Sequence, residues 1–201
     1  MAVTEAHRAG RKVVAHAHGG EGIRNALEAG VDCIAHGIML DSESIQLMKN
    51  KGVYLEPTIS VYARILEAPK GVPQFMVERT KQVHDHHRQS LRAAIRAGVK
   101  VIAGTDSGSP YHLPPLSLVR ELEIFAEEGM SPLEAIRAAT GLAAEGVGKE
   151  QELGTIEVGH LADIIAVEGE PHKNLGALRA VRWVMKGGQI SFNQTVPASQ
   201  V

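Results

Sequence analysis

The sequence predicts an α/β protein in which strands and helices alternate along the first 148 residues. Three apolar segments end in histidine or aspartate next to glycine: Val13–Gly20, Cys33–Gly37 and Val101–Gly108. Short apolar runs of this kind are typical of buried parallel strands, and segments with helical periodicity lie between them. Strands that alternate with helices form parallel sheets through right-handed crossovers. We therefore expect the polar residues to meet at the C-terminal ends of neighbouring strands, where α/β folds bind ligands.

Composition narrows the class of protein. The chain has 201 residues, of which 44% are hydrophobic, so it can bury one sizeable core. A formal net charge of -2 and an aromatic content of 3% do not favour binding to nucleic acid, which needs basic patches and stacking rings. The single cysteine, Cys33, cannot form an internal disulfide, and no signal segment or apolar span of membrane length occurs. These features predict a cytoplasmic protein with neither membrane nor nucleic acid as a partner.

The elements of the first part follow from apolar periodicity and from helix boundary signals. Strands are expected at residues 11–18, 31–36, 53–58 and 99–104. Helices are expected at residues 2–9, 22–29, 116–128 and 131–140, with one capped by Asp41 or Ser42 that ends at Gly52 and a long one that ends at Gly98. The segment Ser131-Pro132-Leu133-Glu134 has capping-box spacing with proline at the first helical position. Residues 60–73 contain two prolines and a glycine, which predict an irregular excursion.

The pattern changes after Gly148. Residues 153–167 carry two short strand signals around a turn. The segment Val181–Met185, followed by Lys186-Gly187-Gly188-Gln189-Ile190, predicts a hairpin. We therefore expect two units, an α/β part in residues 1–148 and a small antiparallel module in residues 149–201.

The order of the motifs resembles the amidohydrolase superfamily. The motifs are His-Ala-His-Gly, Ala-His-Gly, Gly-Thr-Asp-Ser-Gly, Ser-Pro-Leu-Glu-Ala-Ile-Arg-Ala-Ala-Thr and Leu-Gly-Thr-Ile-Glu-Val-Gly-His-Leu-Ala-Asp-Ile. Within the superfamily the chain is similar to imidazolonepropionase-like enzymes, metal-dependent prolidases and arginine carboxypeptidases, over Ala2–Ile190. The resemblance implies the C-terminal half of a (β/α)8 TIM barrel, strands 5 to 8. It also implies that part of a small β-sandwich follows, which the family builds from both termini.

Spacing places the histidines in later strands of such a barrel. About ninety residues separate His16 from Asp106, and a βα unit takes about thirty, so four strands fit and eight do not. His16-Ala17-His18 is therefore not the family's first-strand His-x-His pair. That pair and the family's fourth-strand lysine, which is carbamylated in binuclear members, have no counterpart here. Because the chain also opens inside a helix, we expect it to be part of a longer enzyme.

The resemblance implies a metal site formed by His16, His36 and Asp106, at the positions of the fifth, sixth and eighth strands. Imidazoles and a carboxylate suit a divalent metal, with Zn²⁺ expected as one or two ions. Such an ion polarises the scissile carbonyl and lowers the pKa of bound water from about 15.7 to about 7. By resemblance Asp106 is also the catalytic residue, a general base that then protonates the leaving nitrogen. The alternative for an aspartate after Gly-Thr is a helix cap.

Three further residues are candidates for contact with a small-molecule amide or dipeptide substrate. His18 lies two residues beyond His16 on the same strand face, so it either orients a ligand or substrate or binds the metal itself. Tyr62 follows the third expected strand and His112 follows the fourth, where barrel loops contact substrates. Ordinary loop packing is the alternative for both.

Two other features have simpler interpretations. His84, His86 and His87 share an expected helix with charged neighbours, which predicts a solvated polar face. Cys33 opens a strand and is interpreted as small core filler rather than a nucleophile.

Three functions of different classes remain open from the sequence. The first is metal-dependent hydrolysis of C–N bonds by a longer enzyme that contains this chain, and the opening helix favours it. The second is a catalytically inactive half-barrel that serves as a scaffold or interaction partner. The third is a metal-binding protein without hydrolysis. Because half a barrel leaves two open sheet edges, the chain expressed alone is expected to form oligomers or aggregates.

Overall fold

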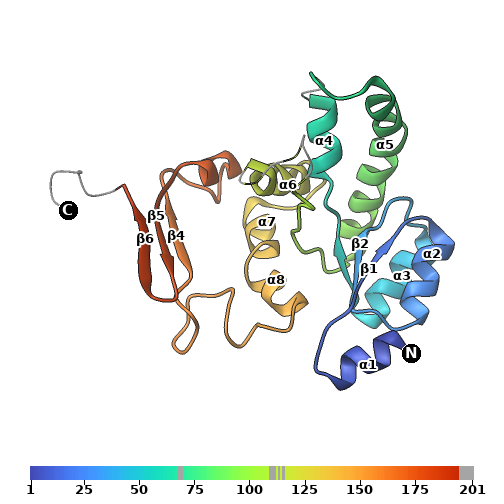
Figure 1. The fold of residues 1–201 in the computed structure, drawn as a ribbon, viewed down its shortest axis with the longest axis horizontal. Helices are drawn as coiled ribbons and strands as arrows, with labels where there is room; N and C mark the ends of the chain where they lie inside the picture. Colours follow the sequence, from blue (N-terminus) through green and yellow to red (C-terminus); the bar gives the residue numbers. More distant parts are fainter. Residues whose placement is uncertain (68–69, 109–111, 113, 115, 195–201) are drawn as a thin grey trace.

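The computed structural model describes residues 1–67, 70–108, 112, 114 and 116–194. Its elements in chain order are α1 (Ala2–Arg8), β1 (Val14–Ala17), α2 (Gly20–Glu28), β2 (Cys33–His36), α3 (Ser42–Lys51), β3 (Tyr54–Glu56), α4 (Ser60–Glu67), α5 (Gln74–Ala97), α6 (Leu116–Glu127), α7 (Pro132–Ala138), α8 (Gly141–Gly146), β4 (Ile164–Val167), the 3-10 helix η1 (Leu175–Arg179), β5 (Val181–Lys186) and β6 (Gln189–Asn193). Figure 1 shows β1, β2 and α1–α5 at one end, α6–α8 in the middle and β4–β6 at the other end. The expected alternation of strands and helices is therefore present in an α/β fold.

The parallel sheet has the order β1-β2-β3, and most of the helices beside it contribute to a core on one of its faces. The core on that face combines strand residues with residues of α2, α3, α5, α6 and α7. Its members include Ala17, Ile34, Leu55, Val101, Ile23, Leu27, Met48, Leu91, Ala94, Phe125 and Ala135. A second, smaller hydrophobic cluster consists of Cys33, Tyr54 and Ile102, and Leu142 of α8 packs against it. Cys33 is buried there, in keeping with its interpretation as core filler.

The fourth expected strand, residues 99–104, is shorter than predicted. It lies beside β3, but only a single parallel bridge joins Leu55 to Val101. Two residues beyond the bridge, the N–H of Ala103 donates to the carbonyl oxygen of Ala138 in α7, over 2.9 Å. The backbone thus leaves the sheet early because a helix takes over its hydrogen bonding.

The prediction of an irregular excursion is wrong at its beginning, where α4 forms a helix. The carboxylate of Glu121, on α6, accepts hydrogen bonds from the backbone N–H groups of Ile59 (3.0 Å) and Ser60 (2.7 Å). These contacts satisfy donors at the start of α4, a position where helices need partners from outside. Because the partner lies about sixty residues away in the sequence, no local pattern indicates this cap.

The boundaries of other helices agree with the sequence. Gly98 ends α5 with a left-handed backbone (φ 79°). Ser131 and Glu134 form the predicted capping box of α7: each side chain accepts a hydrogen bond from the backbone N–H of the other residue. The short helix α8 was not predicted. In the described ranges, no helix has both the length and the apolar character needed to cross a membrane.

The predicted solvated face of α5 is wrong for His87, whose side chain is 1% exposed. Thr80, His87 and Ala94 recur at a spacing of seven residues and are all buried, so they lie on the face of α5 that packs inward. His84 is partly buried, and only His86 is exposed as predicted. Charged neighbours in the sequence obscured this inward face.

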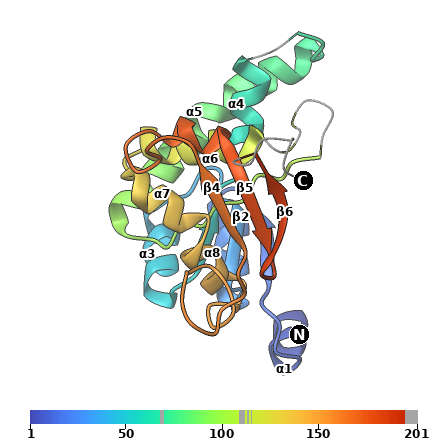
Figure 2. The same cartoon turned by 90° about the vertical axis from the view of Figure 1, so that its left-hand side faces the viewer.

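The C-terminal strands form a separate antiparallel sheet in the order β4-β5-β6. Figure 2 shows this sheet lying in front of α6, α7 and α8. The predicted hairpin is present as β5 and β6, but the first strand signal of residues 153–158 forms no strand. Ile156 and Val158 are 83% and 107% exposed, and no described strand flanks β4 on its open side. A strand needs a paired neighbour, and this segment has none among the described residues.

Candidate functional site

Three imidazoles gather at the C-terminal ends of β1 and β2. The ring centroids of His16 and His36 are 4.4 Å apart, those of His16 and His18 are 4.6 Å apart, and those of His18 and His36 are 5.2 Å apart. His16 and His18 are exposed, whereas His36 is 9% exposed. The cluster therefore has an open side that a ligand can reach from solvent and a buried side that fixes one ring.

His36 reaches this cluster through an unusual backbone conformation. The register pairs His16 with Ala35 and Ala17 with His36, so regular alternation would place His36 on the opposite face from His16. His36 has a φ of 71°, in the left-handed region that residues other than glycine seldom adopt. This conformation explains how the two rings meet despite the register.

Contacts from two other elements hold His36 in place. The hydroxyl of Thr58, beyond β3, lies 2.6 Å from Nδ1 of His36. Nε2 of His87, on α5, donates to the carbonyl oxygen of His36 over 2.9 Å. Burial lowers the pKa of His87 to about 3, so its ring is neutral at pH 7. With Nδ1 of His36 engaged, Nε2 is the ring nitrogen left for a ligand.

Two imidazoles of the cluster, those of His36 and His18, have a lowered pKa and are therefore biased toward the neutral form. Burial, followed by the neighbouring rings of His16 and His18, lowers the pKa of His36, and the charge of Asp106 opposes this effect. Burial and the nearby His16 lower the pKa of His18. Metal ions and protons compete for the same nitrogen lone pairs, so neutral rings are the form that binds a metal.

Asp106 lies beyond the fourth expected strand, next to the histidine cluster. Its backbone is left-handed (φ 48°), as is that of Thr58 (φ 53°). Its charge contributes, after burial, to the raised pKa of Glu56 and of Tyr62. Glu56 extends over Gly104, where an added Cβ would lie 1.8 Å from Oε1 of Glu56. Two carboxylates, those of Glu56 and Asp106, therefore lie close enough to interact near the ends of β3 and of the fourth expected strand.

The two loop candidates differ in their surroundings. Tyr62 is half-buried on α4, and its ring packs edge-on against that of His87, with centroids 5.4 Å apart. His112 is buried: its Nε2 donates to the carbonyl oxygen of Thr105 over 2.9 Å, and its Nδ1 lies 3.4 Å from the hydroxyl of Ser117. His112 thus lies behind the turn that carries Asp106, and its contact with a substrate stays a prediction.

The donors suit a divalent metal in their chemistry, because neutral imidazoles and carboxylates are zinc ligands. Among the described residues, however, no group of three or more His, Cys, Asp or Glu side chains is arranged to hold an ion at once. The structure brings His16, His18 and His36 together and places Asp106 close enough to affect the pKa of His36.

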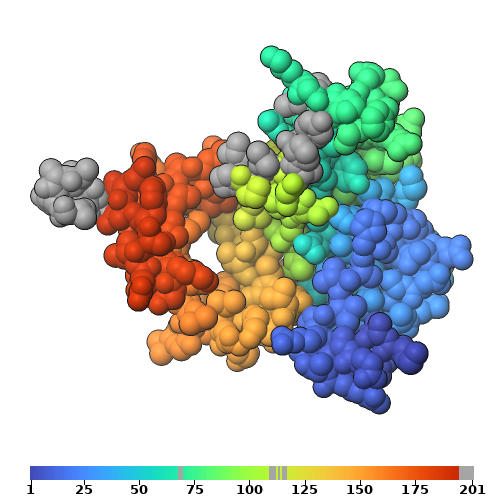
Figure 3. All heavy atoms as spheres, in the orientation of Figure 1, coloured from blue at the N-terminus to red at the C-terminus, as the bar shows by residue number. Residues whose placement is uncertain are grey.

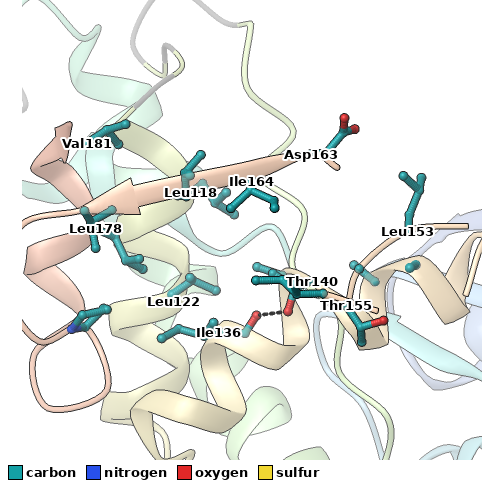
Figure 4. Close-up of a pocket in the computed structure, with 18 of the residues that line it drawn as sticks. Leu118, Leu122, Ile136, Thr140, Leu153, Thr155, Asp163, Ile164, Leu178 and Val181 are labelled. Carbon is teal, nitrogen blue, oxygen red and sulfur yellow. Dashed lines mark hydrogen bonds between the residues drawn. The ribbon is translucent and has the colours of Figure 1, made fainter. Parts of the chain in front are cut away.

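An apolar cavity of about 830 Å³ lies away from these residues, between α6–α8 and the β4–β5 strands. Figure 3 shows the hollow between the C-terminal sheet and the middle of the molecule. Figure 4 labels residues of its walls, among them Leu118, Leu122 and Ile136 from the helices and Ile164 and Val181 from the strands. The cavity is lined mainly by aliphatic side chains and contains none of the candidate site residues, so it carries no part of the proposed chemistry.

Sequence reasoning missed several residues that shape the site. Glu56 follows an apolar strand, and the pattern that singled out His36 and Asp106 applies equally to it. Thr58 and His87 act through contacts with His36 across long sequence separations, which a single sequence does not show. Glu121 lies in the middle of a helix, where a buried carboxylate has no local signature.

The family model for the amidohydrolase family matches residues 1–191. The chain therefore belongs to the amidohydrolase family, the class to which the α/β fold and the histidine cluster point.

Individual relatives have hydrolase names. The chain is 37% identical to "Ochratoxinase" of Aspergillus niger over 196 residues, which cover 94% of this chain and 39% of the relative. It is 26% identical to "Probable imidazolonepropionase" of Nematostella vectensis, covering 87% of this chain and 37% of the relative. The crystal structure of a Xaa-Pro dipeptidase with bound methionine in the active site matches with a TM-score of 0.85 and 36% identity, over 95% of this chain and 47% of that chain. The chain thus spans less than half the length of these relatives.

Proposed function

We propose that the chain is the C-terminal half of a (β/α)8 barrel, strands 5 to 8, in residues 1–148, followed by part of a β-sandwich in residues 149–201. It would belong to a metal-dependent hydrolase of C–N bonds. The observation that carries this proposal is the convergence of His16, His18 and His36 at the ends of two adjacent parallel strands. Coverage of less than half of each relative supports a longer enzyme.

In this proposal His16, His36 and Asp106 hold one or two divalent ions, with Zn²⁺ as the expected metal. A bound divalent ion would polarise the scissile carbonyl and acidify a water molecule. The hydroxyl of Thr58 orients the ring of His36 through Nδ1, a contact of the kind that fixes metal-binding histidines. Exposed His16 and His18 leave the site open to a substrate.

Asp106 is proposed as the group that accepts the proton of the attacking water and returns it to the leaving nitrogen. Half-buried Tyr62 is proposed to donate a hydrogen bond to a substrate carbonyl or carboxylate, and its raised pKa keeps the phenol protonated. His18 and His112 are the other proposed substrate contacts. The names of the dipeptidase and of the imidazolonepropionase support a small amide or dipeptide as substrate.

A second candidate is a metal-binding or scaffold protein without hydrolysis, which would need no more than the histidine cluster at the ends of β1 and β2. The described residues contain no closed group of three metal-binding side chains. If the chain works without the remainder of a barrel, it would bind an ion weakly and lack much of a substrate pocket. A location in the cytoplasm and self-association of the isolated chain are also proposals.

The test is to express residues 1–201, measure size by light scattering, and titrate Zn²⁺ against a chromophoric chelator. Hydrolysis of a panel of Xaa-Pro dipeptides and N-acyl amino acids is then assayed with and without added zinc. Zinc-dependent hydrolysis would support the enzyme. Zinc binding that requires His16 and His36 but gives no hydrolysis, even when residues 1–201 are part of the longer chain that the first candidate expects, would favour the second candidate. Absence of both would contradict a metal site in this chain.

A further inference from the structure

Glu121 is a fully buried carboxylate that the proposed chemistry does not use. It lies on α6 with 0% exposure. A carboxylate in this position is costly unless hydrogen bonds compensate for lost hydration. Here Oε1 accepts from the N–H of Ile59 and Oε2 accepts from the N–H of Ser60, so both oxygens bind the same turn.

That turn connects Glu121 to the ring of His36. Ile59 and Ser60 directly follow Thr58, whose backbone is left-handed and whose hydroxyl binds Nδ1 of His36. A non-glycine residue keeps such a conformation only where its surroundings hold it. The Glu121 carboxylate holds the backbone at the two residues that follow, and so it limits where the Thr58 hydroxyl lies.

A second set of contacts runs from the same turn toward Asp106. The hydroxyl of Ser60, which also binds the Glu121 carboxylate, lies 3.4 Å from Nε2 of His112. Nε2 of His112 donates to the carbonyl oxygen of Thr105, the residue before Asp106. The loops that carry the two sides of the candidate site are therefore tied together behind it.

We propose that Glu121 is a positioning residue that holds the Thr58 turn directly and the Asp106 turn through Ser60 and His112. This inference rests on the proposed metal-dependent function for its consequence, since its effect is to keep the ring of His36 and the carboxylate of Asp106 at a fixed separation. In the part of the chain that the structure describes, Glu121 forms no hydrogen bond with either of those two groups.

The test compares Glu121→Gln with Glu128→Gln. Glutamine keeps the shape of glutamate but replaces one acceptor oxygen with an NH₂ group, which cannot accept from a backbone N–H. Glu128 is a matched control, because it is also buried at the end of α6 but pairs with Arg88 and Arg92 on α5, away from the site. Both variants replace a buried carboxyl group with an amide, so a general loss of stability affects both.

The first readout is amide hydrogen exchange measured by NMR, which needs neither metal nor activity. Glu121→Gln is expected to speed exchange at Ile59 and Ser60 at least tenfold more than Glu128→Gln does. Equal exchange in the two variants would overturn the proposal. If Glu121→Gln does not fold, Ser60→Ala, which removes the hydroxyl and keeps both backbone donors, is expected to perturb the amide signals of residues 105–107. Unchanged signals there would overturn the second set of contacts.

The second readout is zinc affinity, with kcat and KM where turnover is measurable. Glu121→Gln is expected to weaken zinc binding about tenfold, in the range seen when the outer contacts of metal ligands are removed, and Glu121→Asp to restore part of it. Localised exchange with unchanged zinc affinity would overturn the link to the site. If the parent chain binds no zinc, the proposed function fails, and the exchange data still decide whether Glu121 holds the turn.

Discussion

The imidazole of His36 lies 4.4 Å from that of His16, although the strand register pairs His36 with Ala17. One backbone conformation and two contacts produce this relationship. The backbone of His36 is left-handed, the Thr58 hydroxyl contacts Nδ1 of its ring, and the His87 ring donates a hydrogen bond to its carbonyl oxygen. The position of this ring is therefore set by Thr58, beyond β3, and by His87 of α5 as much as by its own strand.

Removing the Thr58 hydroxyl should weaken metal binding. Thr58→Val keeps the branched shape but cannot bind Nδ1 of His36, so the ring loses its orientation. We expect zinc affinity to fall about 10- to 100-fold, measured by competition with a chelator. Thr58→Ser, which keeps the hydroxyl, should bind zinc nearly as the parent does, and equal affinities for all three proteins would contradict the role given to Thr58.

Replacing Asp106 should separate metal binding from turnover in the active enzyme. Asn tolerates the left-handed backbone at this position better than most residues, so Asp106→Asn leaves the turn intact. Turnover should fall about a hundred- to ten-thousandfold because the proton-transfer group is lost, while most zinc is retained. The measurements are kcat and zinc content, and near-normal kcat would show that another group is the base.

His87 should make the fold sensitive to acid. Its pKa is about 3 in the folded chain and about 6.5 when unfolded, so between these values the unfolded state binds more protons and stability falls as the pH falls. The loss attributable to His87 is at most about 5 kcal/mol. Urea unfolding at pH 7 and pH 4 should show a smaller difference for His87→Gln than for the parent.

The parent must be compared with His87→Gln because Glu121 changes the stability with pH in the opposite direction to His87. Burial raises its pKa to about 7, so this group favours the folded state as the pH falls from 7 toward 4.5. The contribution of Glu121 is common to both proteins and cancels in the difference. An identical pH dependence for parent and His87→Gln would mean that His87 titrates normally.

Gly104 should resist substitution because Glu56 occupies the space beside it. An alanine Cβ would lie 1.8 Å from Oε1 and 2.6 Å from Cγ of Glu56, so the side chain must move. We expect Gly104→Ala to cost about 1 to 3 kcal/mol in urea unfolding. Gly22→Ala is the control: it lies within α2 with open space around it and should stabilise by about 0.5 to 1 kcal/mol.

The sequence predicted the strand and helix order well where the signals are local. Gly98 and the capping box at Ser131 mark their helices correctly because those interactions join residues close in the chain. The start of α4 was missed because its cap comes from Glu121. The strand signal around Ile156 failed because periodicity reports which residues can form a strand, and pairing decides whether they do.

For the candidate site, sequence pattern brought out His16, His36 and Asp106 but not the residues that arrange them. A polar residue at the end of an apolar strand can be recognised from the sequence alone. The reversal of His36 to the face of His16 is not, because it depends on a single φ angle and on contacts with Thr58 and His87.

The left-handed backbones of His36, Thr58 and Asp106 also bear on how this protein responds to selection for heat resistance. Each such conformation costs of order 1 to 3 kcal/mol in a non-glycine residue. Glycine at any of them would relieve that cost, so a screen that rewards survival at high temperature, and not catalysis, should enrich glycine at these three positions. Thermostable variants recovered in this way would have less backbone strain but would lack the side chains of the candidate site.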